Sequence, residues 1–383
     1  MDVVVLGAGY AGLTLTRLLE SRLPAAADIT LVNDGADHVL VHELHRVIRR
    51  PGAADVISVP IADVLSRASF VNDRVVDVDP EAGEAALAGG DTASWDVGAL
   101  CLGSETAFYG IDGLREHATP LKSLADAASI REGVGVLCET GGRVVVGGAG
   151  LSGIQAAGEI AALVREEGVD AADRPEVVLV EQREEVAPSF PARFSDAVRE
   201  ELTDRGVDVE TGTTIERARA DALETDAGTL RYDELVWTGG IEGDAAVDRE
   251  RPTVRGDLRL TESTLALGDA ATVVDADGER VPASAAAATR EAKTAAENVG
   301  RLVEHALGAD GGDADGFAPR LDQFRFDVPG WLVSVGDGSV AQVGPSVLRG
   351  RPAAVAKAAT GAAYLASVGA ADNAVDLVET ELL

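Results

Sequence analysis

Short apolar runs alternate with helix-like stretches along the chain. The opening segment, DVVVLGAGYAGLTLTRLLESRL (residues 2–23), passes from a β-branched run through a glycine turn into a stretch with Leu15, Leu18 and Leu19 on one helical face. The next apolar run is DITLVND (28–34). The same order returns in GRVVVGGAGLSGIQAAGEIAALVREEG (142–168), followed by PEVVLVEQRE (175–184). The pattern predicts two β-α-β units, and hence an α/β protein with an internally duplicated domain.

The segments after each unit also share a pattern. Residues 55–87 alternate apolar and polar positions and predict a small antiparallel element, and residues 206–240 repeat this alternation. Residues 263–274 then resume a buried strand, and residues 282–307 predict a long helix. An acidic glycine linker at 309–316 precedes a third piece, 317–383.

The glycines of both units have the spacing of a phosphate-binding turn. Gly7, Gly9 and Gly12 give G-x-G-x-x-G between a predicted strand and helix, and Gly148, Gly150 and Gly153 repeat it. The first glycine of such a motif allows the tight turn, the second lets the backbone approach a diphosphate, and the third allows close helix packing. The helix N-terminus then faces the phosphate charge. We therefore expect two Rossmann-like, three-layer dinucleotide-binding domains, with a small C-terminal α+β domain.

The residue at the end of the second strand of each unit contacts a ribose in such folds. The first unit has Asn33 followed by Asp34, and an asparagine can still form a hydrogen bond with a ribose hydroxyl. The second unit has Glu181, whose carboxylate favours a free 2′-hydroxyl and repels a 2′-phosphate. Glu181 therefore favours NADH over NADPH, although Arg183 nearby leaves NADPH open.

Charge and cysteine content restrict the setting. The 383 residues carry a formal net charge of −32, and the only lysines are Lys122, Lys293 and Lys357. Such a surface repels nucleic acid and is typical of a protein from an extreme halophile, although an acidic mesophilic protein remains an alternative. Cys101 and Cys138 form no C-x-x-C pair, which fits a reducing cytoplasm. We expect no secretory signal and no membrane-spanning helix.

These motifs resemble those of flavoproteins with two dinucleotide-binding domains. TLALGDAA (264–271) resembles the family motif whose aspartate, Asp269 here, binds the ribityl chain of FAD, and CLGS (101–104) stands in the place of the family's ATGS. The resemblance implies that the first glycine turn holds tightly bound, non-covalent FAD and that the second receives NADH as substrate. It places the FAD-binding domain at 1–112 and 251–308, the NAD(P)H-binding domain at 113–250 and the C-terminal domain at 317–383.

Within this superfamily the chain is most similar to type II NADH dehydrogenases, which pass electrons from NADH through FAD to a quinone without proton pumping. The similarity rests on HVLVHELHRV (38–47), residues 95–131, VWTGGI (236–241) and the C-terminal GWLVSVGDGSVAQV (330–343). The missing cysteine pair agrees with it, because disulfide and sulfide reductases need reactive cysteines. We interpret both cysteines as structural thiols in apolar, strand-like contexts.

The resemblance also assigns site residues. For FAD, they are Gly7, Gly9, Ala11, Gly12, Asn33, Asp34, His42, Gly103, Gly268 and Asp269. For the nicotinamide nucleotide, they are Gly148, Gly150, Gly153, Gln155, Glu181 and Gly239.

Three residues are candidates for catalysis. Glu159 matches an acid that the family places near the nicotinamide and flavin, and we expect it to position the nicotinamide or to relay protons; a solvent-facing glutamate is the alternative. The family's A-Q-x-x-x-Q glutamines near the quinone are replaced by Ala286 and Arg290. Arg290 could bind a quinone carbonyl or pair with an acid on a surface helix, and Lys357 stands where relatives place a lysine beside the quinone opening.

His38, His42 and His45 have helical spacing, but their segment matches a region near the flavin, so we expect no metal site. The helix at 351–371 carries Tyr364 and Leu365, with Arg349, Arg351 and Lys357 nearby. It predicts a weak amphipathic anchor for peripheral contact with the inner face of the cell membrane. Packing of the same stripe against the core fits equally well.

The sequence therefore predicts an FAD-dependent NADH dehydrogenase that reduces a menaquinone-like quinone. A soluble NAD(P)H-dependent flavoprotein reductase that donates electrons to a protein carrier or a small oxidant is the alternative. A flavoprotein that binds nucleotides as a sensor without turnover is a third hypothesis. We expect a cytoplasmic protein, and a homodimer is compatible with the C-terminal piece.

Overall fold

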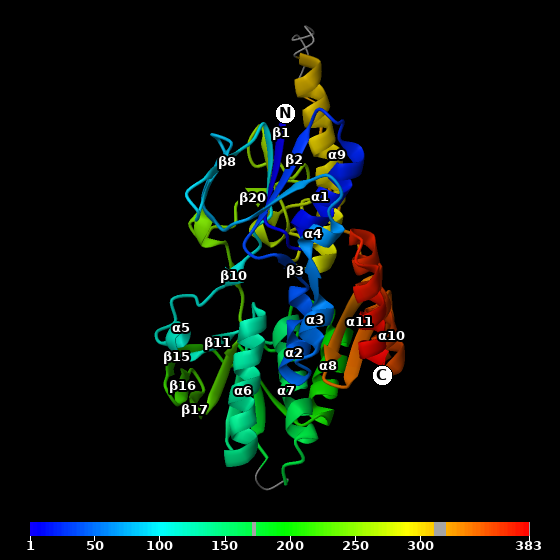
Figure 1. Ribbon diagram of the computed structural model, residues 1–383. Helices are drawn as coiled ribbons and strands as arrows, with labels where there is room; N and C mark the ends of the chain where they lie inside the picture. The colour runs from blue at the N-terminus through cyan, green and yellow to red at the C-terminus, as the bar shows by residue number, and fades with distance from the viewer. Residues whose placement is uncertain (171–173, 310–318, 383) are drawn as a thin grey trace.

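The structure is a computed structural model of the chain that describes residues 1–170, 174–309 and 319–382 (Figure 1). All of the predicted linker 309–316 except Ala309 lies outside the described residues. The domain boundaries given above stay a prediction.

The first parallel sheet lies in the upper half of Figure 1. Its strand order is β21-β9-β1-β2-β5, with β1 (Asp2–Leu6) in the centre. The flanking strands are β2 (Asp28–Asn33), β5 (Ser69–Asn72), β9 (Val97–Leu100) and β21 (Thr264–Ala266). Helices α1 (Tyr10–Arg22) and α9 (Ala285–Ala309) pack together against it. The β-branched residues of β1 are buried, as expected for a strand covered on both faces.

The second parallel sheet repeats the first, in the lower half of Figure 1. Its order is β11-β18-β12-β13-β14, with β12 (Arg143–Gly147) in the centre. The other strands are β11 (Thr119–Pro120), β13 (Glu176–Glu181), β14 (Val207–Thr211) and β18 (Glu234–Trp237). Its helices are α6 (Leu124–Thr140), α7 (Leu151–Glu166) and α8 (Ala192–Asp204). The predicted duplication is therefore confirmed.

Each parallel sheet has a three-stranded antiparallel companion. In the first half it consists of β6 (Val75–Asp79), β7 (Glu84–Leu87) and β8 (Thr92–Ser94). In the second half it consists of β15 (Ile215–Arg219), β16 (Ala222–Thr225) and β17 (Gly228–Arg231). Antiparallel elements are thus present at 75–94 and 215–231. The prediction for the flanking parts of 206–240 is wrong, because β14 and β18 belong to the parallel sheet.

The prediction for residues 55–72 is wrong. This stretch forms α3 (Ala53–Ile57), β4 (Ser58–Pro60) and α4 (Ile61–Val64), and β5 then joins the parallel sheet beside β2. Helices of one turn are too short to show a 3.6-residue period, so their apolar positions look like strand alternation. The residues before α3 form β3 (Asp37–Val39), a 3₁₀ turn (Val41–Glu43) and α2 (Leu44–Arg49). These elements are inserted between β2 and β5 of the parallel sheet, and β3 pairs with β4.

Two short strands connect the halves. β10 (Glu105–Thr106) leads from the first half to the second, β19 (Ile241–Glu242) leads back, and the two pair antiparallel. Helix α5 (Leu114–His117) follows β10, and a 3₁₀ turn (Ala245–Val247) follows β19. The chain then forms β20 (Thr253–Val254), which pairs with β22 (Thr272–Val273). The 3₁₀ turn Gly268–Ala270 lies between these two strands in the sequence.

The C-terminal part is an antiparallel sheet followed by two helices, drawn in orange and red beside α3 (Figure 1). The strands are β23 (Gly330–Val335), β24 (Gly338–Val343) and β25 (Ser346–Arg349), and the helices are α10 (Arg351–Val368) and α11 (Ala371–Leu382). Leu365 is fully buried, and the half-buried Tyr364 packs against Tyr10. The stripe with these two residues therefore packs inward, as in the alternative of packing against the core.

The cysteines need one correction. Cys101 directly follows the buried strand β9, as predicted, but Cys138 lies on helix α6. The apolar run Val134–Cys138 resembles a strand by composition. It lies, however, in a 17-residue helix that begins upstream at the capping box of Ser123 and Asp126. Both cysteines are free thiols.

Candidate functional site

The first glycine turn leaves open space at the N-terminus of α1. Gly7 has φ +98°, and a Cβ atom there would lie 2.4 Å from the carbonyl oxygen of Cys101. A Cβ atom on Gly12 would lie 1.8 Å from the oxygen of Gly7, so strand, turn and helix are in contact. At Gly9, by contrast, a Cβ atom would meet nothing within 4 Å. Gly9 is also the N-cap of α1 and provides no side-chain cap for the helix N–H groups.

The second glycine turn has the same geometry. Gly148 has φ +97°, and a Cβ atom on Gly153 would lie 1.8 Å from the oxygen of Gly148. Gly150 is the N-cap of α7, again without a side-chain cap, and a Cβ atom there would meet nothing within 4 Å. Both turns therefore present uncapped helix N–H groups to open space, which is the arrangement that binds a diphosphate.

The ribose-binding positions are also equivalent. Asn33 Oδ1 accepts a hydrogen bond from the Ala8 N–H at 2.8 Å, and Glu181 Oε2 accepts one from the Ala149 N–H at 2.8 Å. The other oxygen of Glu181 accepts from the Arg183 N–H at 2.9 Å. Both side chains thus lie beside their own glycine turn, whereas Asp34 is exposed next to Asn33.

Asp269 is held in a polar cluster that the sequence did not reveal. Ser104 Oγ donates to Asp269 Oδ2 at 3.3 Å, and Lys122 Nζ donates to Ser104 Oγ at 3.0 Å. Glu291 Oε2 accepts the Gly268 N–H at 2.7 Å. Burial raises the pKa of Glu291 to about 7 and lowers the pKa of Lys122. Only the rarity of lysine in this chain could have drawn attention to Lys122.

The residues around the first turn fit FAD. Gly103 has φ +76° and open space at its Cβ position, and a Cβ atom on Gly268 would lie 3.0 Å from the Ala11 Cβ atom. Gly268 therefore lies against Ala11 in the first turn of α1, and Ser104, next to Gly103, contacts Asp269. Together with the uncapped helix and Asn33, these residues provide donors for a diphosphate, an acceptor for a ribose and a carboxylate for a polyol chain.

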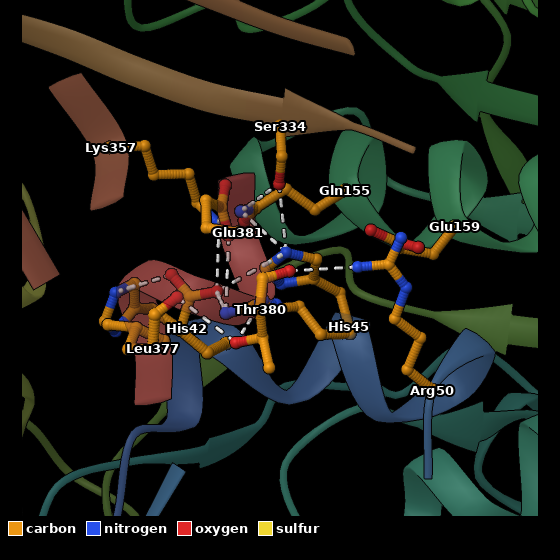
Figure 2. A network of polar contacts seen from close by, with 12 residues as sticks. His42, His45, Arg50, Gln155, Glu159, Ser334, Lys357, Leu377, Thr380 and Glu381 are labelled. Carbon is orange, nitrogen blue, oxygen red and sulfur yellow. Dashed lines mark hydrogen bonds and ion pairs between the residues drawn. The ribbon is translucent and has the colours of Figure 1, made fainter. Parts of the chain in front are cut away.

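A second polar cluster lies where α2 meets α7, β23, α10 and α11 (Figure 2). We call it the Glu43 cluster, and its core consists of Glu43, Arg46, Lys357 and Glu381. The buried Glu43 Oε2 lies 2.8 Å from Lys357 Nζ, and Glu381 Oε1 lies 3.5 Å from the same nitrogen. Arg46 Nη1 lies 3.3 Å from Glu381 Oε2. Although burial raises it, the pKa of Glu43 is well below its usual range because Lys357 and His42 stabilise the carboxylate.

His45 and Gln155 form the next contacts of this cluster (Figure 2). His45 Nε2 lies 3.0 Å from Ser334 Oγ and 3.3 Å from Gln155 Nε2. Gln155 Nε2 also donates to Ser334 Oγ at 3.3 Å. The amide nitrogen of Gln155, a residue that the resemblance assigns to the nicotinamide nucleotide, thus points toward His45 and Ser334.

Glu159 is buried beside Arg49. The residue is 4% exposed, and its Oε2 lies 2.9 Å from Arg49 Nε, without hydrogen-bond alignment. Arg49 also pairs with Glu166 and Asp337. Burial raises the pKa of Glu159 to about 7, and Arg49 opposes this rise. The alternative of a solvent-facing Glu159 is therefore wrong.

Arg290 lies apart from this cluster in the contacts of the described residues. It is half-buried on α9, and its Nη1 donates to the Ala286 carbonyl of the same helix at 3.0 Å. Lys357, in contrast, is buried and fully engaged with Glu43 and Glu381.

The three histidines lie on different elements, not on one helix. His38 is on β3, where Nδ1 contacts the Ala8 carbonyl at 2.8 Å and Nε2 contacts the Tyr364 hydroxyl at 2.9 Å. Burial lowers the pKa of His38 to about 4. His42, in the 3₁₀ turn, contacts the Tyr10 hydroxyl and Glu43. The helical spacing in the sequence is thus accidental, and the described residues hold no group of metal-ligating side chains.

Tyr10 connects the Glu43 cluster to the first glycine turn. It is the first residue of α1, directly after Gly9, and its ring packs against Tyr364 with centroids 4.7 Å apart. Burial raises the pKa of Tyr10 well above its usual range, so the phenol stays protonated. Tyr10, Glu43, Arg49 and Glu381 were missed in the sequence because their partners come from distant segments.

Comparisons with known proteins agree with this geometry. A type II NADH:quinone oxidoreductase of Staphylococcus aureus (strain NCTC 8325) is 26% identical over 332 residues, covering 79% of this chain and 82% of the relative. This match confirms the resemblance inferred from the sequence motifs.

Solved structures share the fold. The structure of NDH2 from Plasmodium falciparum in complex with NADH covers 99% of this chain and 97% of its own, with a TM-score of 0.76 and 14% identity. The sulfide:quinone oxidoreductase from Aquifex aeolicus covers 97% and 92%, with a TM-score of 0.75 and 17% identity. Residues 1–292 match the family described as pyridine nucleotide-disulphide oxidoreductase. The chain belongs to the pyridine nucleotide-disulphide oxidoreductase family.

Proposed function

We propose that this protein is an FAD-dependent NADH:quinone oxidoreductase of type II. The observation that carries the proposal is the pair of equivalent glycine turns, each with an uncapped helix N-terminus over open space. Bound FAD would supply the redox chemistry, namely hydride acceptance from NADH and electron transfer to a quinone. The relative from Staphylococcus aureus bears the name of this activity.

The residues of the first half would hold FAD. The N-terminus of α1 at Gly9 binds the diphosphate, Asn33 binds the adenosine ribose, and Asp269 binds the ribityl chain. Ser104 and Lys122 orient the Asp269 carboxylate. The residues of the second half would hold NADH: Gly150 with the N-terminus of α7 binds its diphosphate, and Glu181 binds its ribose and disfavours a 2′-phosphate.

Electrons would leave the flavin without a cysteine relay. Cys101 and Cys138 are free thiols on different elements, and burial raises the pKa of Cys101 far above its usual range, so its thiolate does not form at neutral pH. Glu159, with a pKa near 7, can bind or release a proton at neutral pH. We assign Glu159 to proton exchange and Arg290 to the acceptor side. Lys357, which is paired with Glu43 and Glu381, would act on the acceptor only through its charge.

The test is a spectrum followed by two additions, with purified protein in concentrated salt. The protein should show a flavin spectrum, NADH should bleach it without oxygen, and a water-soluble naphthoquinone should restore it. A ferredoxin serves as the competing acceptor. Reoxidation by the ferredoxin but not by the quinone would contradict the proposed acceptor, and a flavin-free protein would contradict the whole proposal.

We further propose that the reaction takes place at the inner face of the membrane. None of the helices in the described part of the chain combines the length and the hydropathy that a membrane span requires. Exposed Val343, Leu348, Val355 and Val375 provide apolar contacts in the C-terminal part. Flotation with quinone-containing liposomes in concentrated salt should recover the protein with lipid, and Val355→Asp with Val375→Asp should reduce recovery. Equal recovery of both proteins would contradict this surface.

A further inference from the structure

Tyr109 is an exposed aromatic residue with an unusual backbone conformation. It lies in the loop between β10 and α5, is 65% exposed, and has φ +53°. Few aromatic residues adopt positive φ, and those that do are often held by surrounding contacts at functional sites. The question is therefore what holds Tyr109 here.

The loop of Tyr109 is bonded to the turn Thr238–Gly240 at the end of β18. Tyr109 Oη donates to the Gly239 carbonyl at 3.3 Å, and the Ala107 N–H donates to the Gly240 carbonyl at 3.1 Å. Trp237 Nε1 donates to the Ala107 carbonyl at 2.8 Å. A Cβ atom on Gly240 would lie 1.9 Å from Tyr109 Oη, so a side chain there would displace the tyrosine.

The same turn lies against the second glycine turn. Thr238 Oγ1 is 3.0 Å from the carbonyl oxygens of both Gly147 and Gly148. A Cβ atom on Gly148 would lie 2.7 Å from the Gly239 Cα atom. Tyr109 is therefore linked through one short turn to the residues that would bind the NADH diphosphate.

The strand order indicates which half of the nucleotide is nearby. Dinucleotides lie across the carboxyl ends of the strands, with the diphosphate at the glycine turn and the adenosine ribose at the acid of the next strand. Here these positions are the turn after β12 and Glu181 at the end of β13. Because β18 lies on the other side of β12, the nicotinamide half extends toward the end of β18, where Tyr109 rests.

We propose that Tyr109 is a positioning residue for the nicotinamide half of the nucleotide. This inference rests on the function proposed above and assigns a residue that the glycine motifs do not include. The hydroxyl bond to Gly239 orients the ring, and the ring limits the movement of the nicotinamide and its ribose. An aromatic ring also attracts a cation, and the nicotinamide of NAD⁺ is positively charged, so the ring contributes to NAD⁺ binding as well.

The test measures NAD⁺ binding to the oxidised, flavin-loaded protein by calorimetry, because this readout requires no turnover. Tyr109→Gly should raise the Kd for NAD⁺ by about 3- to 10-fold, the range expected for the loss of one aromatic contact. Tyr109→Phe keeps the ring and should raise it by less than about 3-fold. In stopped-flow experiments, flavin reduction at saturating NADH should also be slower in Tyr109→Gly, because a less restrained nicotinamide reaches the hydride-transfer geometry less often.

Asp248→Gly is the matched control, because Asp248 is another exposed residue with positive φ, +54°, whose N–H bonds to Ala245. It should bind NAD⁺ like the wild type. If Tyr109→Gly binds NAD⁺ as tightly as the wild type while NADH still bleaches the flavin, the inference is wrong and the proposed function stands. If the wild type neither binds NAD⁺ nor is bleached by NADH, both are wrong.

Discussion

Buried carboxyl groups with opposite pKa shifts lie within one region of the molecule. Glu159 and Glu43 are both almost fully buried, at 4% and 2% exposure. The pKa of Glu159 is raised to about 7 by burial, whereas that of Glu43 is lowered because Lys357 and His42 more than offset its burial. Of these two residues, Glu159 can therefore exchange protons near neutral pH, whereas Glu43 is a permanent charge that fixes Lys357.

Glu159 should make folding stability depend on pH. A carboxyl group with a higher pKa in the folded state contributes stability that is fully present below its ordinary pKa of 4.5 and is lost as the pH rises through about 7. Between pH 5 and pH 8, the wild type should therefore lose about 2 to 3 kcal/mol of unfolding free energy relative to Glu159→Gln. Chemical denaturation at both pH values measures this difference.

Glu166→Gln is the control for this measurement. Glu166 lies on the same helix and also faces Arg49, at 3.5 Å, but its side chain is 54% exposed. This variant should follow the wild-type pH dependence. A Glu159→Gln protein with the wild-type pH dependence would show that Glu159 does not titrate in this range.

The pair of Glu43 and Lys357 should behave as a coupled unit. Glu43→Gln should destabilise the fold by about 3 to 5 kcal/mol, because it leaves a buried ammonium without its nearest carboxylate. Adding Lys357→Met should recover a substantial part of this loss, since an apolar side chain needs no counter-charge. Additive losses in this double-mutant cycle would show that the two groups do not interact.

At the scale of elements, helix α11 joins the C-terminal part to α3 and β4. Asn373 Nδ2 donates to the carbonyl oxygens of Val56 and Ser58, at 3.0 and 3.2 Å, at the end of α3. Asn373→Ala should therefore cost about 1 to 3 kcal/mol and increase hydrogen exchange in α11. Asp376→Ala, an exposed change on the same helix, should affect neither. Equal exchange in the two variants would contradict this role of Asn373.

The elements that repeat were predictable, and those that depend on distant partners were not. The spacing of Gly7, Gly9 and Gly12 identifies a strand, a turn and a helix from local sequence alone, and the structure has all three. In the Glu43 cluster, Glu43 pairs with a lysine 314 positions away, and no local pattern records that pairing. Glu159 was found only through the family resemblance, because its burial depends on tertiary packing.

At the scale of the whole molecule, the net charge of −32 should make stability depend on salt. At 1 M salt the Debye length is about 3 Å, so repulsion between surface carboxylates is largely screened. The melting temperature should rise steadily as KCl increases from 0.2 M to 3 M. A melting temperature that is highest in dilute buffer would contradict the halophilic interpretation.

The central claim is that the two glycine turns hold different nucleotides. Gly9 and Gly150 both have φ −71°, which alanine adopts freely, and a Cβ atom at either position meets no protein atom within 4 Å. Alanine should therefore preserve the fold at both positions and obstruct only the nucleotide.

The most direct measurement compares the flavin spectra of Gly9→Ala and Gly150→Ala before and after NADH is added. Gly9→Ala should be purified folded but with little flavin. Gly150→Ala should keep its flavin, resist bleaching by NADH and still be bleached by dithionite. A Gly150→Ala protein that loses its flavin, or one that NADH reduces as readily as the wild type, would contradict the assignment of the two turns.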